Sequence, residues 1–292
     1  MKFAASPSPF LWWRRVKEFV EWVLKVESLG YDAIFFPDHY NLPISRYPSN
    51  DLLDAWSTLS YIAAKTRETK IGTCVTPLTR WLPSQLAKVI ATIDILSEGR
   101  TIVGLGAGYF SDEFINYSPQ GYLGDPKERV ERFLEGLHVM IKLWTEEKVT
   151  FNGKYYRLRE AILSPKPKQK PKPPLWSGGI GPRMLKVTAK YFDAWLPHRG
   201  ETGYPTPEKY KEAVAFIRGH LKKYGRDPNK FTFALLGRIS EKAKDDIDIL
   251  EKYSQAGCQY YVVEIPLTFP LSSGEHHIKV IEKFAKEVMP SF

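Results

Sequence analysis

Short hydrophobic runs alternate along the chain with longer segments in which hydrophobic positions recur every three or four residues. The short runs, such as AIFF and YYVVE, are apolar throughout, which is typical of parallel strands covered on both faces. The longer segments have the spacing of helices with one buried side. The pattern predicts strands at 2–5, 33–36, 71–75, 101–105, 174–177, 193–196, 231–236 and 260–264. It predicts a helix after each strand, at 14–29, 53–66, 84–97, 127–144, 182–191, 208–223, 242–256 and 276–288.

Eight consecutive strand–helix units predict an α/β fold, a single (β/α)₈ TIM barrel over residues 1–292. An open, doubly wound sheet is the alternative, because periodicity does not show closure. The fourth unit is longer than the others, with an insertion at about 109–172. Within it, Asn152-Gly153 lies between two β-favouring runs and predicts a tight hairpin. We expect the inserted hairpin and loop to lie at the carboxyl ends of the strands and to cover a pocket there.

The chain has 42 Lys and Arg residues against 33 Asp and Glu residues, a net charge of +9. Most of the excess is spread over predicted helix faces, and the PKPKQKPKPP segment at 165–174 is typical of an extended, solvated linker. No recognition motif accompanies the charge, so we expect no nucleic-acid partner. Cys74 and Cys258 have neither disulfide nor metal-ligand spacing. No stretch is long and apolar enough to span a bilayer, and we expect a cytoplasmic protein with no membrane partner.

A carboxylate and an imidazole follow the second predicted strand, at Asp38 and His39. In a barrel these residues stand at the mouth, where catalytic groups lie, and histidine transfers protons near neutral pH. The alternative is structural, with Asp38 capping the next turn and His39 packed beneath it. After the third strand, Cys74 has no histidine or cation paired with it in the pattern. That pattern favours a small buried residue over a nucleophile.

Two glycine-rich segments follow later strands. The first is Gly104-Leu105-Gly106-Ala107-Gly108-Tyr109. A dinucleotide-binding turn has a glycine at the sixth position and a helix directly after it, whereas this segment has Tyr109 there and no predicted helix at the turn. Its glycines instead indicate close approach of a ligand to the backbone. The second, Ser177-Gly178-Gly179-Ile180-Gly181-Pro182-Arg183, leads from a strand into a helix. Free N–H groups at such a helix start attract phosphate and Arg183 adds charge, although a tight turn would use the same glycines.

These residues, in this order, resemble the bacterial luciferase-like superfamily. It comprises flavin-dependent monooxygenases and the reductases and dehydrogenases that use the deazaflavin coenzyme F420. The resemblance covers nearly the whole chain and is carried by LGYDAIFFPDHY, IGTCVTPLTRWLPSQLAKVIATIDILSEGRTIVGLGAGY, VTFNGKYYRL and PPLWSGGIGPRMLKVTAKYFDAWLP. It implies a (β/α)₈ barrel with an insertion, a bound cofactor and, in this family, a homodimer. Trp12, Trp13 and Trp22 are candidates for the dimer interface or for the core.

The resemblance also implies roles for individual residues. His39 matches a residue near the reactive ring and the substrate, and we expect Asp38 to orient it. The ring is expected on the segment Thr73, Cys74 and Val75, whose Cys74–Val75 bond matches a non-prolyl cis peptide of the deazaflavin branch. Gly106, Ala107 and Gly108 match backbone beside the ring, with their glycines leaving space for it. Ser177, Gly178, Gly179, Ile180 and Gly181 match the phosphate-binding loop, which Arg183 follows.

Two positions depart from branches of this family. Tyr109 stands where the sugar-phosphate dehydrogenase branch has an acidic residue, and Asp112 and Glu113 are the nearby alternatives, unless both are solvated loop residues. At its first strand the chain reads Phe3-Ala4-Ala5-Ser6-Pro7, without the glutamate that the methylene-tetrahydromethanopterin reductase branch has there. The resemblance therefore leaves the substrate open.

The function that these patterns favour is hydride transfer between F420 and a small organic substrate, with no metal. F420 is preferred to FMN because Lys and Arg residues flank the phosphate loop and F420 has the longer anionic tail. The alternatives are an FMN-dependent monooxygenase that uses reduced flavin and oxygen, and a non-catalytic flavin-binding barrel.

Overall fold

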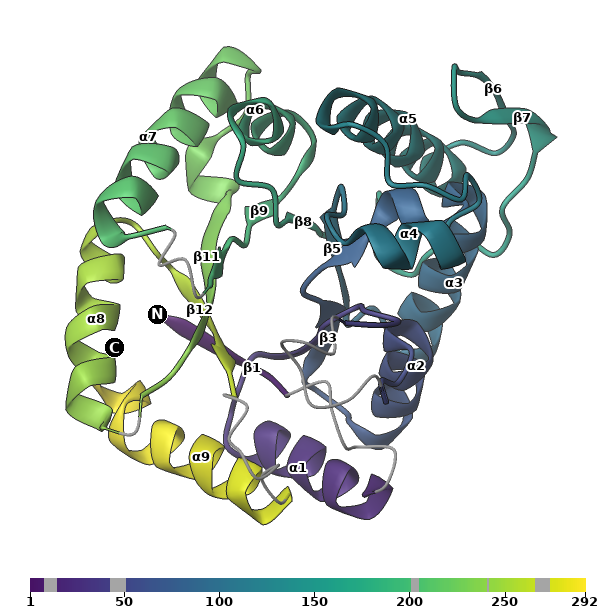
Figure 1. The fold of residues 1–292 in the computed structure, drawn as a ribbon. Helices are drawn as coiled ribbons and strands as arrows, with labels where there is room; N and C mark the ends of the chain where they lie inside the picture. Colours follow the sequence, from purple (N-terminus) through teal and green to yellow (C-terminus); the bar gives the residue numbers. More distant parts are fainter. Residues whose placement is uncertain (8–14, 43–50, 201–204, 241, 266–273) are drawn as a thin grey trace.

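The described part of the computed structural model is a closed, parallel eight-stranded barrel surrounded by helices (Figure 1). The structure describes residues 1–292 except 8–14, 43–50, 201–204, 241 and 266–273. The barrel strands are β1 Lys2–Ser6, β2 Ala33–Phe36, β3 Lys70–Thr73, β5 Thr101–Gly106, β8 Leu175–Ser177, β9 Ala194–Trp195, β11 Thr232–Arg238 and β12 Tyr260–Glu264. Pairing runs around the ring and returns from β9 to β11, which closes it. The predicted closed barrel is therefore confirmed.

A helix follows each barrel strand and packs on the outside of the ring. These helices are α1 Val16–Ser28, α2 Ala55–Lys65, α3 Pro83–Leu96, α5 Pro126–Thr145, α6 Pro182–Tyr191, α7 Pro207–Lys223, α8 Ala243–Gln255 and α9 Gly274–Glu287. Their predicted bounds and those of the strands agree with the structure to about two residues, the usual disagreement at element ends. Trp22 on α1 is fully buried in the core, whereas Trp12 and Trp13 lie outside the described residues.

The third strand is the one that departs most from its prediction, because it stops at Thr73 instead of running to residue 75. The Cys74–Val75 peptide bond is cis, as the resemblance implies. Pairing with β5 resumes in the two-residue strand β4, Thr76–Pro77. The 3₁₀ helix η2, Leu78–Arg80, follows directly. The chain thus forms a bulge at the carboxyl end of β3.

Glycines on the next two strands make room for this bulge. A Cβ atom on Gly104 would lie 1.8 Å from the Thr73 carbonyl oxygen. A Cβ atom on Gly106 or on Gly178 would lie 2.9 Å from Cγ2 of Val75. The expectation that the glycines after the fourth strand leave space for a ring is therefore wrong for Gly104 and Gly106, because protein atoms fill that space.

The insertion contains α4 Ser111–Tyr117, helix α5 and the predicted hairpin of β6 Val149–Asn152 with β7 Arg157–Ala161. The hairpin does not cover the barrel mouth: Figure 1 shows it outside α5, away from the barrel axis. The Lys/Pro segment is not a solvated linker either. Lys166 Nζ donates to Leu143 O at 2.7 Å, and Lys172 pairs with Asp193 at 2.7 Å, so the segment is bound along the barrel wall.

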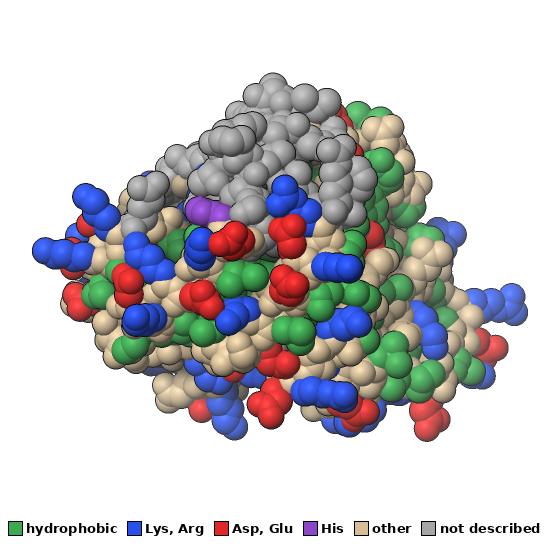
Figure 2. Space-filling view, turned by 90° about the horizontal axis from the view of Figure 1, so that it is seen from below, with side chains coloured by type: hydrophobic (Ala, Val, Ile, Leu, Met, Phe, Trp, Pro, Cys, Tyr) green, Lys and Arg blue, Asp and Glu red, His purple; other side chains and the backbone are tan. Residues whose placement is uncertain are grey.

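Charged side chains of both signs are interspersed over the face seen in Figure 2, which lies below α1 and α9 in Figure 1. The described part of this face has no large area of a single sign, in agreement with charges spread over helix faces. Among the described residues, no helix has the length and apolar character needed to cross a membrane.

The contact of Gly104 with Thr73 predicts that Gly104→Ala destabilises the fold by about 3 kcal/mol or more, since backbone has to move to admit the methyl group. Urea unfolding followed by circular dichroism measures this. Gly219→Ala is the matched control, because nothing lies within 4 Å of its added Cβ in α7. The control should stabilise the protein by about 0.5–1 kcal/mol. Equal stability of the two variants would contradict the close approach.

Candidate functional site

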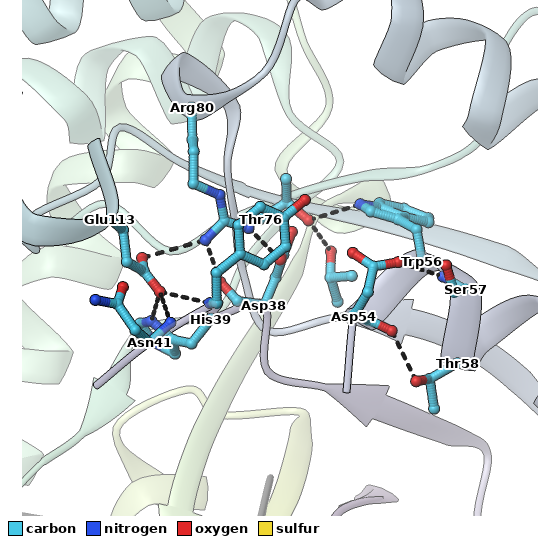
Figure 3. A network of polar contacts seen from close by, with 12 residues as sticks. Asp38, His39, Asn41, Asp54, Trp56, Ser57, Thr58, Thr76, Arg80 and Glu113 are labelled. Carbon is cyan, nitrogen blue, oxygen red and sulfur yellow. Dashed lines mark hydrogen bonds and ion pairs between the residues drawn. The ribbon is translucent and has the colours of Figure 1, made fainter. Parts of the chain in front are cut away.

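Four charged or titratable side chains from three parts of the chain meet at the carboxyl ends of β2, β3 and β5 (Figure 3). Asp38 and His39 follow β2, Arg80 ends η2, and Glu113 lies in the first turn of α4. The carboxyl ends of barrel strands are where active sites form. The predicted pair therefore stands in the expected place, with two further partners.

Arg80 is the centre of this cluster and is completely buried. Its Nη2 pairs with Asp38 Oδ1, and its Nη1 donates to Glu113 Oε2 at 3.2 Å and to Asp38 O at 3.3 Å. The guanidinium carbon lies 3.8 Å from the centre of the Tyr40 ring. A buried cation needs such compensation, and two carboxylates and one aromatic face provide it.

Glu113 is the group that contacts His39. Its Oε1 lies 3.1 Å from His39 Nδ1 and accepts from the backbone N–H of Tyr40 at 2.7 Å and of Asn41 at 3.3 Å. Burial alone would raise the pKa of Glu113, but the contact with His39 and the charge of Arg80 outweigh it and lower the pKa. An ionised carboxylate only accepts hydrogen bonds, so Nδ1 of His39 carries hydrogen. Nε2 has no partner among the residues that the structure describes.

The expectation that Asp38 orients His39 is therefore wrong in its choice of residue. Burial raises the pKa of Asp38, while the charge of Arg80 acts to lower it. Its carboxylate binds Arg80, and the partner of the imidazole is Glu113. Sequence reasoning noted Glu113 only as an alternative acid and did not single out Arg80. The signal for Arg80 was a lone cation in the otherwise uncharged run TPLTRWLP.

The bulge after β3 lies beside this cluster. Thr73 is fully buried, and its hydroxyl donates to Gly104 O at 2.9 Å, so its side chain ties β3 to β5. Cys74 is half-buried, with Sγ 3.5 Å from Ser6 Oγ. Burial raises the pKa of the Cys74 thiol to about 12. The thiol is therefore protonated at neutral pH, as expected for a packing residue rather than a nucleophile.

The segment Gly106–Gly108 is fixed by contacts from the insertion side. Thr79 Oγ1 donates to Ala107 O at 2.9 Å, and Arg129 Nη1 donates to Gly108 O at 3.2 Å. Gly108 has a φ of 83°, and an added Cβ would lie 2.2 Å from the Phe114 ring. Tyr109 follows, largely exposed, with its ring 5.9 Å from that of His39. An aromatic side chain thus lies beside the imidazole at the barrel mouth.

The loop after β8 offers part of the anion site that its sequence suggests. The N–H of Gly178 donates to Leu105 O at 3.1 Å, and that of Gly179 donates to Ser177 Oγ at 3.3 Å. These two groups are therefore engaged. Within the described part of the chain, no acceptor takes the backbone N–H of Ile180, Gly181 or Arg183, which surround the exposed start of α6. Free N–H groups at a helix start are suited to binding phosphate.

Another set of polar groups, which was not predicted, lies at the carboxyl ends of β11 and β12 and in the short strand β10, His198–Arg199. His198 Nε2 lies 2.9 Å from Glu264 Oε2, and Arg238 Nε lies 3.4 Å from the same oxygen. His198 lies in β10, and Arg238 and Glu264 are the last residues of β11 and β12. Of these residues only Glu264 lies within a predicted strand, and His198 and Arg238 each lie two residues past one. In the part of the chain that is described, no group of three or more His, Cys, Asp or Glu side chains is arranged to hold a metal ion.

Comparison with known proteins gives three kinds of match. The family model described as luciferase-like monooxygenase matches residues 4–271. The F420-dependent glucose-6-phosphate dehydrogenase of Intrasporangium calvum is 33% identical over 190 residues, which are 63% of this chain and 54% of that protein. The chain therefore spans little more than half of that relative's length.

Two solved structures share the fold over almost the entire length of both chains. An F420-dependent secondary alcohol dehydrogenase, in complex with an F420-acetone adduct, superposes with a TM-score of 0.81 and 20% identity, covering 99% of this chain and 98% of that chain. The monooxygenase RslO1 from Streptomyces bottropensis superposes with a TM-score of 0.78 and 18% identity, covering 99% of each.

The lowered pKa of Glu113 predicts a pH-dependent contribution to stability. The contribution is complete above the ordinary pKa of about 4.5 and is lost as the pH falls through the lowered pKa of the folded state. Glu113→Gln should lower the free energy of unfolding at pH 7 by about 1.5–3 kcal/mol, the range for hydrogen bonds to charged groups. The difference from the unsubstituted protein should shrink in acid. Urea unfolding across this pH range measures it.

Glu251→Gln, on the exposed side of α8, is the control and should change stability little at any pH. A Glu113→Gln deficit that stays constant down to strongly acid pH would mean that ionised Glu113 does not stabilise the fold.

Proposed function

The chain belongs to the luciferase-like monooxygenase family, and from this premise we propose that it is an F420-dependent oxidoreductase. In this proposal it transfers hydride between the deazaflavin and a small organic substrate. The observation that carries the proposal is the contact of ionised Glu113 with Nδ1 of His39 at the barrel mouth beside the cis bulge. Among the described residues, Nε2 of His39 has no hydrogen-bond partner. Two proteins that this chain is similar to, the glucose-6-phosphate dehydrogenase and the secondary alcohol dehydrogenase, are named as F420-dependent, which supports the proposal.

The residues present suit an anionic, ring-bearing cofactor. The backbone N–H groups of Ile180, Gly181 and Arg183, which have no acceptor among the described residues, would bind a phosphate. The exposed Arg183 side chain, whose Nη2 lies 4.0 Å from Glu131 Oε1, would add charge. The flat ring would lie against the half-buried edge of Cys74 and Val75. The glycines on β5 would act indirectly, by letting the bulge pack closely. When bound, F420 supplies the carbon that accepts or donates the hydride.

His39 is the proton carrier in this proposal. During oxidation of an alcohol, its neutral Nε2 would accept the hydroxyl proton while the hydride leaves the adjacent carbon with two electrons, giving a ketone. During reduction, the imidazolium would return that proton to the carbonyl oxygen. Glu113 would stabilise the imidazolium through Nδ1, and Arg80 would keep Glu113 ionised and in place. Tyr109 would form one wall of the substrate space.

A flavin monooxygenase is the second candidate. The description of the matching family and the shared fold with RslO1 favour it. Such an enzyme would need reduced FMN and oxygen. Its phosphate and ring would occupy the same loop and bulge, so the two candidates differ in cofactor tail and in oxygen use.

Titration of the purified apo-protein with F420 and with FMN separates these candidates. We expect F420 to quench tryptophan fluorescence with an affinity at least about tenfold higher than that of FMN, a difference of about 1.4 kcal/mol. Arg183→Met should weaken F420 binding about two- to fivefold, the size of a solvent-exposed charge contact. Arg159→Met on the distant hairpin is the control and should bind normally. Tighter binding of FMN would favour the monooxygenase.

Replacement of His39 tests the proton carrier. His39→Ala should lower kcat about 10²- to 10⁴-fold, the usual contribution of a general acid or base. The Kd for F420 should change little, because the phosphate loop and bulge stay intact. Turnover is measured with whichever secondary alcohol or sugar phosphate supports reduction of F420 by the unsubstituted protein. His220→Ala is the control, because that ring contacts Phe216 O within its own helix. Unchanged turnover would remove His39 from the mechanism.

A further inference from the structure

A cavity of about 380 Å³ opens at the amino ends of the barrel strands. Its lining includes the first residues of four strands, Lys2, Lys70, Thr101 and Tyr260. The His39 cluster lies at the carboxyl ends, on the opposite side of the barrel. A strand such as β5, with six residues, separates the two ends by about 17–20 Å. We propose that this cavity is a second ligand site, for a small molecule that carries a phosphate group on a flat apolar body.

The charge of the lining favours an anion. Four cationic side chains, Lys2, Lys70, Arg100 and Lys230, face one carboxylate, Asp32. Lys70 Nζ lies 3.0 Å and Lys2 Nζ lies 3.4 Å from Asp32 Oδ1. The two ammonium groups therefore share a single carboxylate and keep N–H groups to donate. Several cations in one concave surface raise the local concentration of anions.

Arg100 contributes charge without being available for direct contact. All five of its N–H donors are taken by neutral acceptors: Nε by Ser97 O, Nη1 by Thr66 Oγ1 and Thr69 O, and Nη2 by Ala63 O and Thr66 O. Each of these contacts fixes the guanidinium in the wall. Arg100 thus supplies a fixed positive charge that its own contacts do not cancel.

Lys230 is the cation best placed to bind a ligand directly. It ends the 3₁₀ helix η3, Pro228–Lys230, just before β11, and it is exposed. Within the described residues, no carboxylate forms an ion pair with it. Together with Lys2 and Lys70 it gives three ammonium groups from three separate strand starts. Such a set matches the several oxygens of a phosphate dianion.

The apolar part of the lining favours a flat body beside the phosphate. Ile102, Trp176 and Phe231 contribute to the wall. Trp176 is held in place by ring contacts, with centroids 5.0 Å from Tyr260 and 5.1 Å from Phe35. The cavity volume lies within the range of about 300–1,000 Å³ found for small-molecule sites. An aromatic phosphate ester would use both kinds of surface.

Calorimetric titration of the full chain with phenyl phosphate and with inorganic phosphate, at constant ionic strength, tests this site. We expect both to bind, phenyl phosphate more tightly. Lys70→Met and Lys230→Met should each weaken binding about tenfold, a loss typical of one charge-assisted contact. Asp32→Asn should strengthen binding by removing the competing carboxylate. Lys222→Met, which removes an exposed cation of α7, should leave the affinity unchanged.

Arg183→Met separates this site from the cofactor loop. It should not alter the binding of phenyl phosphate if the molecule occupies the cavity at the amino ends. Loss of binding in Arg183→Met, with normal binding in Lys70→Met and Lys230→Met, would place the anion at the loop and overturn the proposal. Absence of binding to the unsubstituted protein would overturn it as well. If loss of the Asp32 contact unfolds Lys70→Met, Lys230→Met decides, because its side chain is exposed and has no ion pair to lose within the described residues.

Discussion

The site depends on the burial of a single cation, Arg80. A guanidinium removed from water must be compensated, and here Asp38 and Glu113 do so from opposite sides. This requirement links the end of β2 to η2 and to α4, three segments that are otherwise separate in the sequence. It also fixes Glu113 where its second oxygen meets His39. The orientation of the imidazole is therefore a consequence of how the buried charge is neutralised.

A second constraint is steric and sets the shape of the barrel mouth. The bulge at Cys74–Val75 fits only because Gly104, Gly106 and Gly178 have no side chains to meet it. A chain of buried hydrogen bonds holds the same place: Trp56 Nε1 donates to Thr76 Oγ1, and Thr76 donates to Thr73, each at 3.1 Å (Figure 3). Packing and hydrogen bonding thus bring β3, β5 and β8 together below the proposed ring site.

The sequence was sufficient for the order and bounds of the strands and helices, because periodicity reports which positions are buried. It did not show closure, which the pairing of β9 with β11 establishes. It was sufficient for the position of Asp38 and His39, because a residue after a barrel strand lies at the mouth. It was not sufficient for the partners. Arg80 and Glu113 approach His39 only through the turn of η2 and the path of the insertion, which periodicity does not describe. The interpretation of the glycines failed for a related reason. Their pattern indicates that other atoms pack closely against the backbone, but it does not show whether these atoms belong to the protein or to a ligand.

The structure of the protein with F420 bound would test the proposed site most directly. We expect the ring against Cys74 and Val75, with Nε2 of His39 turned toward the substrate space. We expect phosphate oxygens about 2.7–3.2 Å from the N–H groups of Ile180 and Gly181, the range of a hydrogen bond. A phosphate bound elsewhere, or a His39 ring whose Nδ1 has left Glu113 and faces the ligand, would contradict the proposed site.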